Sequence, residues 1–127
     1  MRPKRVLIID DDRSMCDLIA AIVMNQGYRP TTSYDVENGL MGFTAGLYDL
    51  VISDIYMKGV GGIEGIGRIR KIDQDIPIIA ISGGYNEMSS EKTVLAAQKI
   101  GANHGLTKPF EPDELLAVIT QALDTGA

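Results

Sequence analysis

The sequence predicts a doubly wound α/β domain, built from a five-stranded parallel sheet with five helices on its two faces. Short runs of Val, Ile and Leu recur along the chain, and segments with apolar residues at helical spacing separate them. Strands that alternate with helices form right-handed crossovers, which place the strands parallel in one sheet with helices on both sides. We expect a single domain over residues 1–127, with its core over about 4–123.

Five apolar segments are the predicted strands. They are residues 5–9, 50–53, 76–82 and 106–107, with a weaker fifth candidate at 29–33. The first three are nearly continuous Val, Ile and Leu rather than alternating with polar residues. That pattern is typical of parallel strands that are covered on both faces.

Apolar residues at spacings of three and four predict the five helices. The stripes are Met15, Leu18, Ile19, Ile22 and Val23; Val36, Leu40, Phe43 and Leu47; Ile63, Ile66, Ile69 and Ile72; Val94, Leu95, Ala97 and Ile100; and Leu115, Val118, Ile119 and Ala122. Asp12 is placed to cap the first helix and Gly27 to end it. Gly101 is placed to end the fourth helix, and Pro112 stands at the first position of the last one.

The composition is that of an acidic globular protein. Apolar residues make up 45%, charged residues 23%, and the net charge is −5. Nucleic-acid binding depends on basic patches, so this balance disfavours it. The basic start of the chain is followed by too few apolar residues for a signal peptide, and no apolar run reaches membrane-spanning length. We therefore expect a cytoplasmic protein without membrane contact, in which the single cysteine, Cys16, is a small apolar residue on a helix.

Polar residues stand at the carboxyl ends of four predicted strands. They are Asp10, Asp11 and Asp12 after the first strand, Asp54 after the third, Ser82 at the end of the fourth, and Lys108 and Pro109 after the fifth. Each alone has an ordinary explanation as a helix cap, a turn residue or a solvated loop residue. In open parallel sheets, however, ligands bind beyond the carboxyl ends of the strands.

The combination of these residues indicates a specific chemistry. Carboxylates gathered at one edge repel each other unless a cation neutralises them, and magnesium prefers hard oxygen ligands. A lysine beside such a site is a point charge for a phosphate oxygen. A carboxylate nucleophile, Mg²⁺, a lysine and a hydroxyl together indicate phosphoryl transfer to an aspartate, and Asp54 is the predicted acceptor.

The segments that carry these residues resemble the receiver domain of two-component response regulators. The matching segments are VLIIDDD at 6–12, YDLVISDIYM at 48–57, IIAIS at 78–82, and GAN with LTKPF within 101–110. Single motifs of this kind are weak, but all four in order are highly specific. The resemblance covers nearly the whole chain and implies a flavodoxin-like version of the fold.

The resemblance also implies a role for each site residue. Asp54 would accept a phosphoryl group from a histidine kinase or a histidine phosphotransfer protein. Mg²⁺ would be held by Asp11 and Asp54 directly, by Asp10 mainly through water, and by the backbone carbonyl of Tyr56. Ser82 and Lys108 would grip the phosphoryl oxygens, and the Lys108–Pro109 peptide would be cis.

Phosphorylation would then switch a surface that contacts another protein. The chain would be a signalling protein rather than an enzyme, assisting only its own phosphorylation and dephosphorylation. The sequence as given has no output segment after the last predicted helix, so we expect a downstream protein target. Members of the family often pair through their fourth and fifth helices and last strand, which implies a phosphorylation-linked homodimer.

Four departures from the family pattern affect the site and its switch. Gly105 stands where the family usually has an aromatic residue that swings inward, so the readout must differ. The loop over 83–90 is longer than usual, and we expect it to be mobile and to replace that aromatic readout. Lys58 replaces a usual proline. Tyr56 and Gly84 stand where the family places residues that influence hydrolysis, which predicts slow self-dephosphorylation.

Two alternatives remain open on the sequence alone. Asp10 and Asp12 loosely match the Asp-x-Asp signature of haloacid-dehalogenase-like phosphatases, with Asp10 as nucleophile and Asp12 as acid. That interpretation leaves Asp54 unexplained, and the chain is short for such a fold. The other alternative is a receiver-like binding module that signals without phosphorylation, which the altered loop and Gly105 favour.

Overall fold

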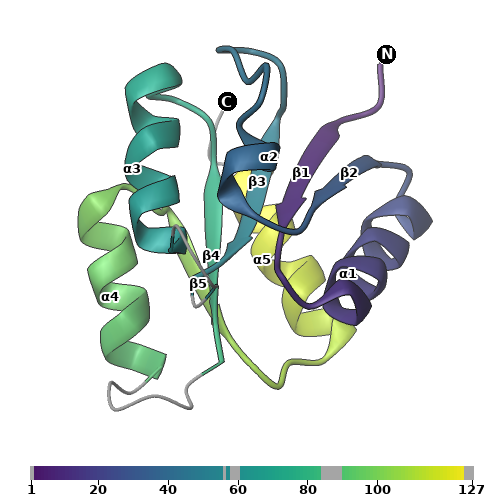
Figure 1. The fold of residues 1–127 in the computed structure, drawn as a ribbon. Helices are drawn as coiled ribbons and strands as arrows, with labels where there is room; N and C mark the ends of the chain where they lie inside the picture. The colour runs from purple at the N-terminus through teal and green to yellow at the C-terminus, as the bar shows by residue number, and fades with distance from the viewer. Residues whose placement is uncertain (1, 56, 58–60, 84–89, 125–127) are drawn as a thin grey trace.

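The computed structural model describes residues 2–55, 57, 61–83 and 90–124. Strands and helices alternate along the chain, as the sequence predicts (Figure 1). In order they are β1 (Arg5–Ile9), α1 (Arg13–Asn25), β2 (Arg29–Ser33), α2 (Val36–Gly39), β3 (Leu50–Asp54), α3 (Gly62–Ile72), β4 (Ile78–Ser82), α4 (Ser90–Ile100), β5 (His104–Thr107) and α5 (Pro112–Asp124). The predicted alternation and all five strands are therefore confirmed.

The five strands form one parallel sheet in the order β2-β1-β3-β4-β5. Alternate residues of each strand point to opposite faces, which creates two separate apolar clusters. One cluster packs the sheet against α1 and α5, and the other packs it against α2, α3 and α4 (Figure 1). The central strands β1, β3 and β4 are buried on both faces, which explains their continuous apolar sequences.

The first helix begins and ends where the sequence predicts. The Asp12 side chain accepts hydrogen bonds from the N–H groups of Ser14 and Met15 at 3.0 and 3.3 Å, and so caps α1. Gly27 follows the helix with φ of 87°, a left-handed conformation that favours glycine. Residues 10–12 are thereby held between the end of β1 and the first turn of α1.

The second predicted helix is too long. The stripe through Leu40, Phe43 and Leu47 predicts a helix of several turns, but α2 ends at Gly39. Gly42 and Gly46 have φ of 74° and 83°, so the chain leaves the helix through turns instead. Phe43 is nevertheless buried in the core, because the turns return it to the sheet face. Three strand boundaries also differ: β3 ends at residue 54 rather than 53, β4 begins at 78 rather than 76, and β5 begins at 104 rather than 106.

Within the described part of the chain, no helix is both long enough and apolar enough to cross a membrane.

Candidate functional site

Four neighbouring strands bring the predicted site residues to one edge of the sheet. Asp54 and Ser82 are the last residues of β3 and β4, while Asp10 and Lys108 directly follow β1 and β5. Backbone hydrogen bonds continue beyond the strands: Asp10 N–H donates to the Ser33 carbonyl at 3.1 Å, and Lys108 N–H donates to the Ser82 carbonyl at 2.8 Å. These bonds fix the backbone at Asp10 and at Lys108.

Three carboxylates meet at this edge. One oxygen from each of Asp10, Asp11 and Asp54 lies within 4.8 Å of the others. Asp10 and Asp54 are buried, at 0% and 5% exposure, whereas Asp11 is exposed. Burial of like charges so close together is unfavourable without a positive charge beside them.

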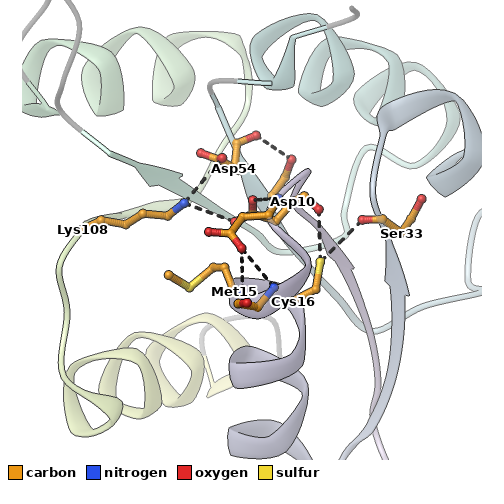
Figure 2. Close-up of polar contacts among 9 residues, drawn as sticks. Asp10, Met15, Cys16, Ser33, Asp54 and Lys108 are labelled. Carbon is orange, nitrogen blue, oxygen red and sulfur yellow. Dashed lines mark hydrogen bonds and ion pairs between the residues drawn. The ribbon is translucent and has the colours of Figure 1, made fainter. Parts of the chain in front are cut away.

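Lys108 supplies one positive charge. Its Nζ lies 3.2 Å from Asp10 Oδ2 and 3.5 Å from Asp54 Oδ2, as Figure 2 shows. Burial disfavours the charged ammonium, but the neighbouring Asp54 and Asp10 carboxylates outweigh it, so the pKa of Lys108 lies above its ordinary value. The Lys108–Pro109 peptide is cis, as predicted.

The remaining charge fits a divalent cation. Three carboxylates against one ammonium leave two negative charges at the cluster. Carboxylate oxygens are hard ligands, and an edge open to solvent at Asp11 leaves room for the waters that Mg²⁺ retains. The donor set therefore fits magnesium.

Ser82 provides a further polar group that is ready for a ligand. Its side chain is fully buried at the end of β4, and its Oγ has no hydrogen-bond partner among the described residues. A buried hydroxyl is normally hydrogen-bonded, so a lone one is a candidate to bind an oxygen that arrives with a ligand.

Some contacts of the site were not predicted. The Cys16 thiol donates to the Asp10 carbonyl at 3.2 Å and lies 3.7 Å from the Ser33 carbonyl (Figure 2). The prediction of a small buried residue on a helix is correct, but it misses this polar contact. Burial, followed by the charge of Asp10, raises the pKa of the Cys16 thiol to about 11, so the thiol keeps its proton.

The backbone oxygen of Asp54 is also closely enclosed. Ser53 Oγ donates to it at 3.0 Å. A Cβ added to Gly62, the first residue of α3, would lie 2.0 Å from the same oxygen, so only glycine fits there. The glycine-rich sequence after Asp54 was a signal for such close packing, although the sequence alone does not say which glycine is required.

Some predicted features lie outside the described residues. These are Tyr56, Lys58, Gly84 and most of the loop over 83–90. Gly105 lies in β5, paired with Ala80 of β4, so the usual aromatic position falls inside the strand, which begins two residues before the predicted start. Asp12 is occupied as the cap of α1, which leaves the phosphatase alternative without its predicted acid.

A parallel α/β sheet whose strand ends gather three carboxylates, a lysine and a buried hydroxyl defines a small domain with an acidic edge whose donors fit a divalent cation. The family model described as the response regulator receiver domain matches residues 6–120. The chain belongs to this family, which confirms the family and the flavodoxin-like fold predicted from the sequence.

Several known proteins are similar to this chain. The transcriptional regulatory protein DltR of Streptococcus agalactiae is 34% identical over 115 residues, which are 91% of this chain and 50% of that protein. The chain thus spans about half the length of this relative. The crystal structure of a CheY-like receiver domain protein from Methanospirillum hungatei superposes with a TM-score of 0.88 and 26% identity, covering 98% of this chain and 97% of that one. The solution structure of a beryllofluoride-activated NtrC4 receiver domain dimer gives a TM-score of 0.85 and 27% identity, covering 97% and 98%.

Proposed function

We propose that Asp54 accepts a phosphoryl group in a two-component phosphorelay and that this modification switches a protein-contact surface. The observation that carries the proposal is the placement of Lys108 between Asp10 and Asp54, with Asp11 beside them. The Lys108 ammonium lies 3.5 Å from the Asp54 carboxylate and so places a positive charge beside the proposed nucleophile.

The donor of the phosphoryl group is a phosphohistidine of a sensor histidine kinase or of a histidine phosphotransfer protein. An oxygen of the Asp54 carboxylate attacks phosphorus, an O–P bond forms, and the P–N bond to the imidazole breaks with its electron pair returning to nitrogen. The nucleophile in this step is a carboxylate, which carries no proton to remove, so the attack needs no general base.

The residues around Asp54 neutralise and orient the incoming group. The Lys108 ammonium, within 3.5 Å of Asp54, offers N–H donors to a phosphoryl oxygen. The Ser82 hydroxyl, which has no hydrogen-bond partner in the described part of the chain, can donate to another. Asp11 and Asp54 would hold Mg²⁺ directly and Asp10 mainly through water, with the Tyr56 carbonyl as the further protein ligand that the family implies. When bound, Mg²⁺ reduces the repulsion between the carboxylate and the phosphoryl oxygens.

The phosphoryl group carries about −1.5 to −2 charges, but the carboxylate loses its own charge when the O–P bond forms, so the buried strand end gains roughly one negative charge. We propose that a move of Ser82 toward this group shifts the chain beyond β4, and that the consequence is contact with a downstream protein or with a second copy of this chain. The similarity to the NtrC4 receiver domain dimer supports the second possibility.

Intact-mass analysis after incubation with acetyl phosphate and Mg²⁺ tests the proposal. The wild type should gain one phosphoryl group, Asp54→Asn should gain none, and removal of Mg²⁺ with EDTA should abolish the gain. Asp12→Asn is the matched control, because Asn caps a helix about as well as Asp and Asp12 serves as the cap of α1. A gain of mass in Asp54→Asn, or none in the wild type, would overturn the proposal.

A further inference from the structure

Every polar group of Asp10 is held by a hydrogen bond. Its N–H donates to the Ser33 carbonyl at 3.1 Å, and its Oδ1 accepts from the Asp12 N–H at 2.9 Å. Its Oδ2 accepts from Lys108 Nζ at 3.2 Å. The fourth group, the backbone carbonyl, accepts from the Cys16 thiol at 3.2 Å (Figure 2). The first contact extends the sheet, the second holds the turn at the N-cap of α1, and the third is the ion pair with Lys108. The thiol contact is separate from all three.

This fourth contact acts on the neighbouring residue. The carbonyl of Asp10 and the N–H of Asp11 belong to one rigid peptide plane. A donor that fixes the direction of the carbonyl therefore also fixes the orientation of the whole peptide plane, which includes the Asp11 Cα. Asp11 is the exposed carboxylate of the cluster, whereas Asp10 and Asp54 are buried, so the direction of its backbone is one determinant of where its side chain lies.

Cys16 is well placed to set this plane. It is fully buried, it lies one turn into α1, and its backbone N–H donates to the Asp12 carbonyl at 3.0 Å. The thiol also lies 3.7 Å from the Ser33 carbonyl at the end of β2. One side chain thus connects the helix to the ends of two strands. An apolar side chain of similar size would fill the same space but would leave the Asp10 carbonyl without this donor.

We propose that Cys16 is a positioning residue of the acidic cluster, whose thiol sets the direction of the peptide between Asp10 and Asp11 and thereby the affinity for Mg²⁺. The inference rests on the proposed function, because it assumes that the cluster binds Mg²⁺. It assigns no redox or nucleophilic role to the thiol, which is buried and protonated.

Titration with Mg²⁺, followed by the amide NMR signals of Asp11 and Asp54, tests the inference. Cys16→Ala removes the donor, whereas Cys16→Ser keeps a donor in a side chain of similar size. We expect Mg²⁺ affinity to fall about fivefold in Cys16→Ala and to stay within about twofold of the wild type in Cys16→Ser. Changing the hydrogen-bond partners of metal ligands costs roughly ten- to a hundredfold in affinity, and the effect here is smaller because the thiol acts through the backbone.

Val23→Ala is the matched control for loss of packing. Val23 is also fully buried on α1, two turns further from the site. This variant should unfold more readily while binding Mg²⁺ as the wild type does. A fall in affinity in Val23→Ala equal to that in Cys16→Ala would mean that general destabilisation explains the effect, and would overturn the inference.

The other outcomes are also decisive. Equal affinity in Cys16→Ala and the wild type overturns the inference but leaves the proposed function intact, and so does an equal loss in Cys16→Ser and Cys16→Ala. A wild type that shows no Mg²⁺-dependent shifts overturns both. If Cys16→Ala does not fold, Cys16→Thr and Cys16→Val provide a second pair of nearly identical shape, of which only Thr carries a donor. Tighter Mg²⁺ binding by Thr than by Val is then the expected result, and equal binding overturns the inference.

Discussion

Replacing Gly62 with alanine should displace the chain around Asp54. The added Cβ would lie 2.0 Å from the Asp54 carbonyl oxygen, 2.7 Å from the Ile55 Cα and 2.9 Å from the Asp54 carbonyl carbon. All three are backbone atoms, which cannot rotate away as the end of a side chain can. Overpacking a core typically costs about 1–3 kcal/mol, and a contact this short with backbone belongs at the upper end, about 3 kcal/mol. For a chain of this length that corresponds to a fall in Tm of about 10 °C.

The same helix offers an internal control. A Cβ added to Gly67 would meet only Ile100 Cγ2 at 3.6 Å, an ordinary van der Waals distance. Gly67 lies inside α3, where alanine is favoured over glycine by about 0.5–1 kcal/mol. Gly67→Ala should therefore raise the Tm slightly, whereas Gly62→Ala lowers it.

Two measurements check this reasoning. Thermal unfolding should show opposite shifts for the two variants. Labelling with acetyl phosphate and Mg²⁺ should be slowed in Gly62→Ala, because the end of β3 moves, and unchanged in Gly67→Ala. A Gly62→Ala protein with wild-type Tm and wild-type labelling would refute the argument that α3 abuts the Asp54 backbone.

Three further predictions concern single side chains. Lys108→Met should lower the free energy of unfolding by about 2 kcal/mol in EDTA, because two buried carboxylates lose their positive partner. Added Mg²⁺ should restore part of this stability. Urea unfolding with and without Mg²⁺ measures the two effects, and an equal loss of stability in both buffers would contradict a metal site at this edge. The pKa of the Cys16 thiol is raised from 9.0 to about 11 by burial and then by Asp10, so the folded state keeps the proton where the unfolded chain loses it. The free energy of unfolding should therefore fall as the pH rises from 9 to 11. In urea unfolding, Cys16→Ala should lose less stability over that range than the wild type. An identical loss in the two proteins would contradict a raised thiol pKa. Arg70 donates hydrogen bonds to two backbone carbonyls and to an amide oxygen, which join the end of α3 to the turn before β5. Arg70→Met should therefore lower the free energy of unfolding by about 2 kcal/mol in urea unfolding. Lys71→Met, at an exposed position, should change it by no more than about 0.5 kcal/mol.

The sequence was informative where burial and chemistry change at a single position. Asp54, Ser82 and Lys108 each stand at or just after the end of an apolar run, and the parallel order of the strands requires those ends to meet. The position of a polar residue at a strand end is visible in the sequence, and the meeting of strand ends follows from the parallel topology. Neither requires knowledge of any distance. The ion pairs of Lys108 with the carboxylates agree with that expectation.

The second helix shows why apolar spacing can mislead. Spacings of three and four report which residues are buried, and Phe43 is indeed buried. They do not report the backbone path between buried residues, which here passes through turns at Gly42 and Gly46. Residue type does not reveal backbone conformation, so the sequence does not distinguish a glycine in a left-handed turn from a glycine inside a helix.

The contacts of Cys16 and Gly62 lay beyond prediction for a different reason. Each depends on the separation between segments, to within a fraction of an ångström, at the junction of a helix and a strand. Residue type alone permits several roles at both positions, including the apolar packing expected of a lone buried cysteine. Only the three-dimensional arrangement of the segments decides which of these roles each residue has.

The ion pair between Asp10 and Lys108 joins residues that are 98 positions apart. During synthesis Asp10, Asp11 and Asp54 leave the ribosome long before Lys108 does. Until β5 docks at the edge of the sheet, Lys108 is not beside the acidic residues. The order of the chain thus ties completion of the charged cluster to docking of the last strand of the sheet.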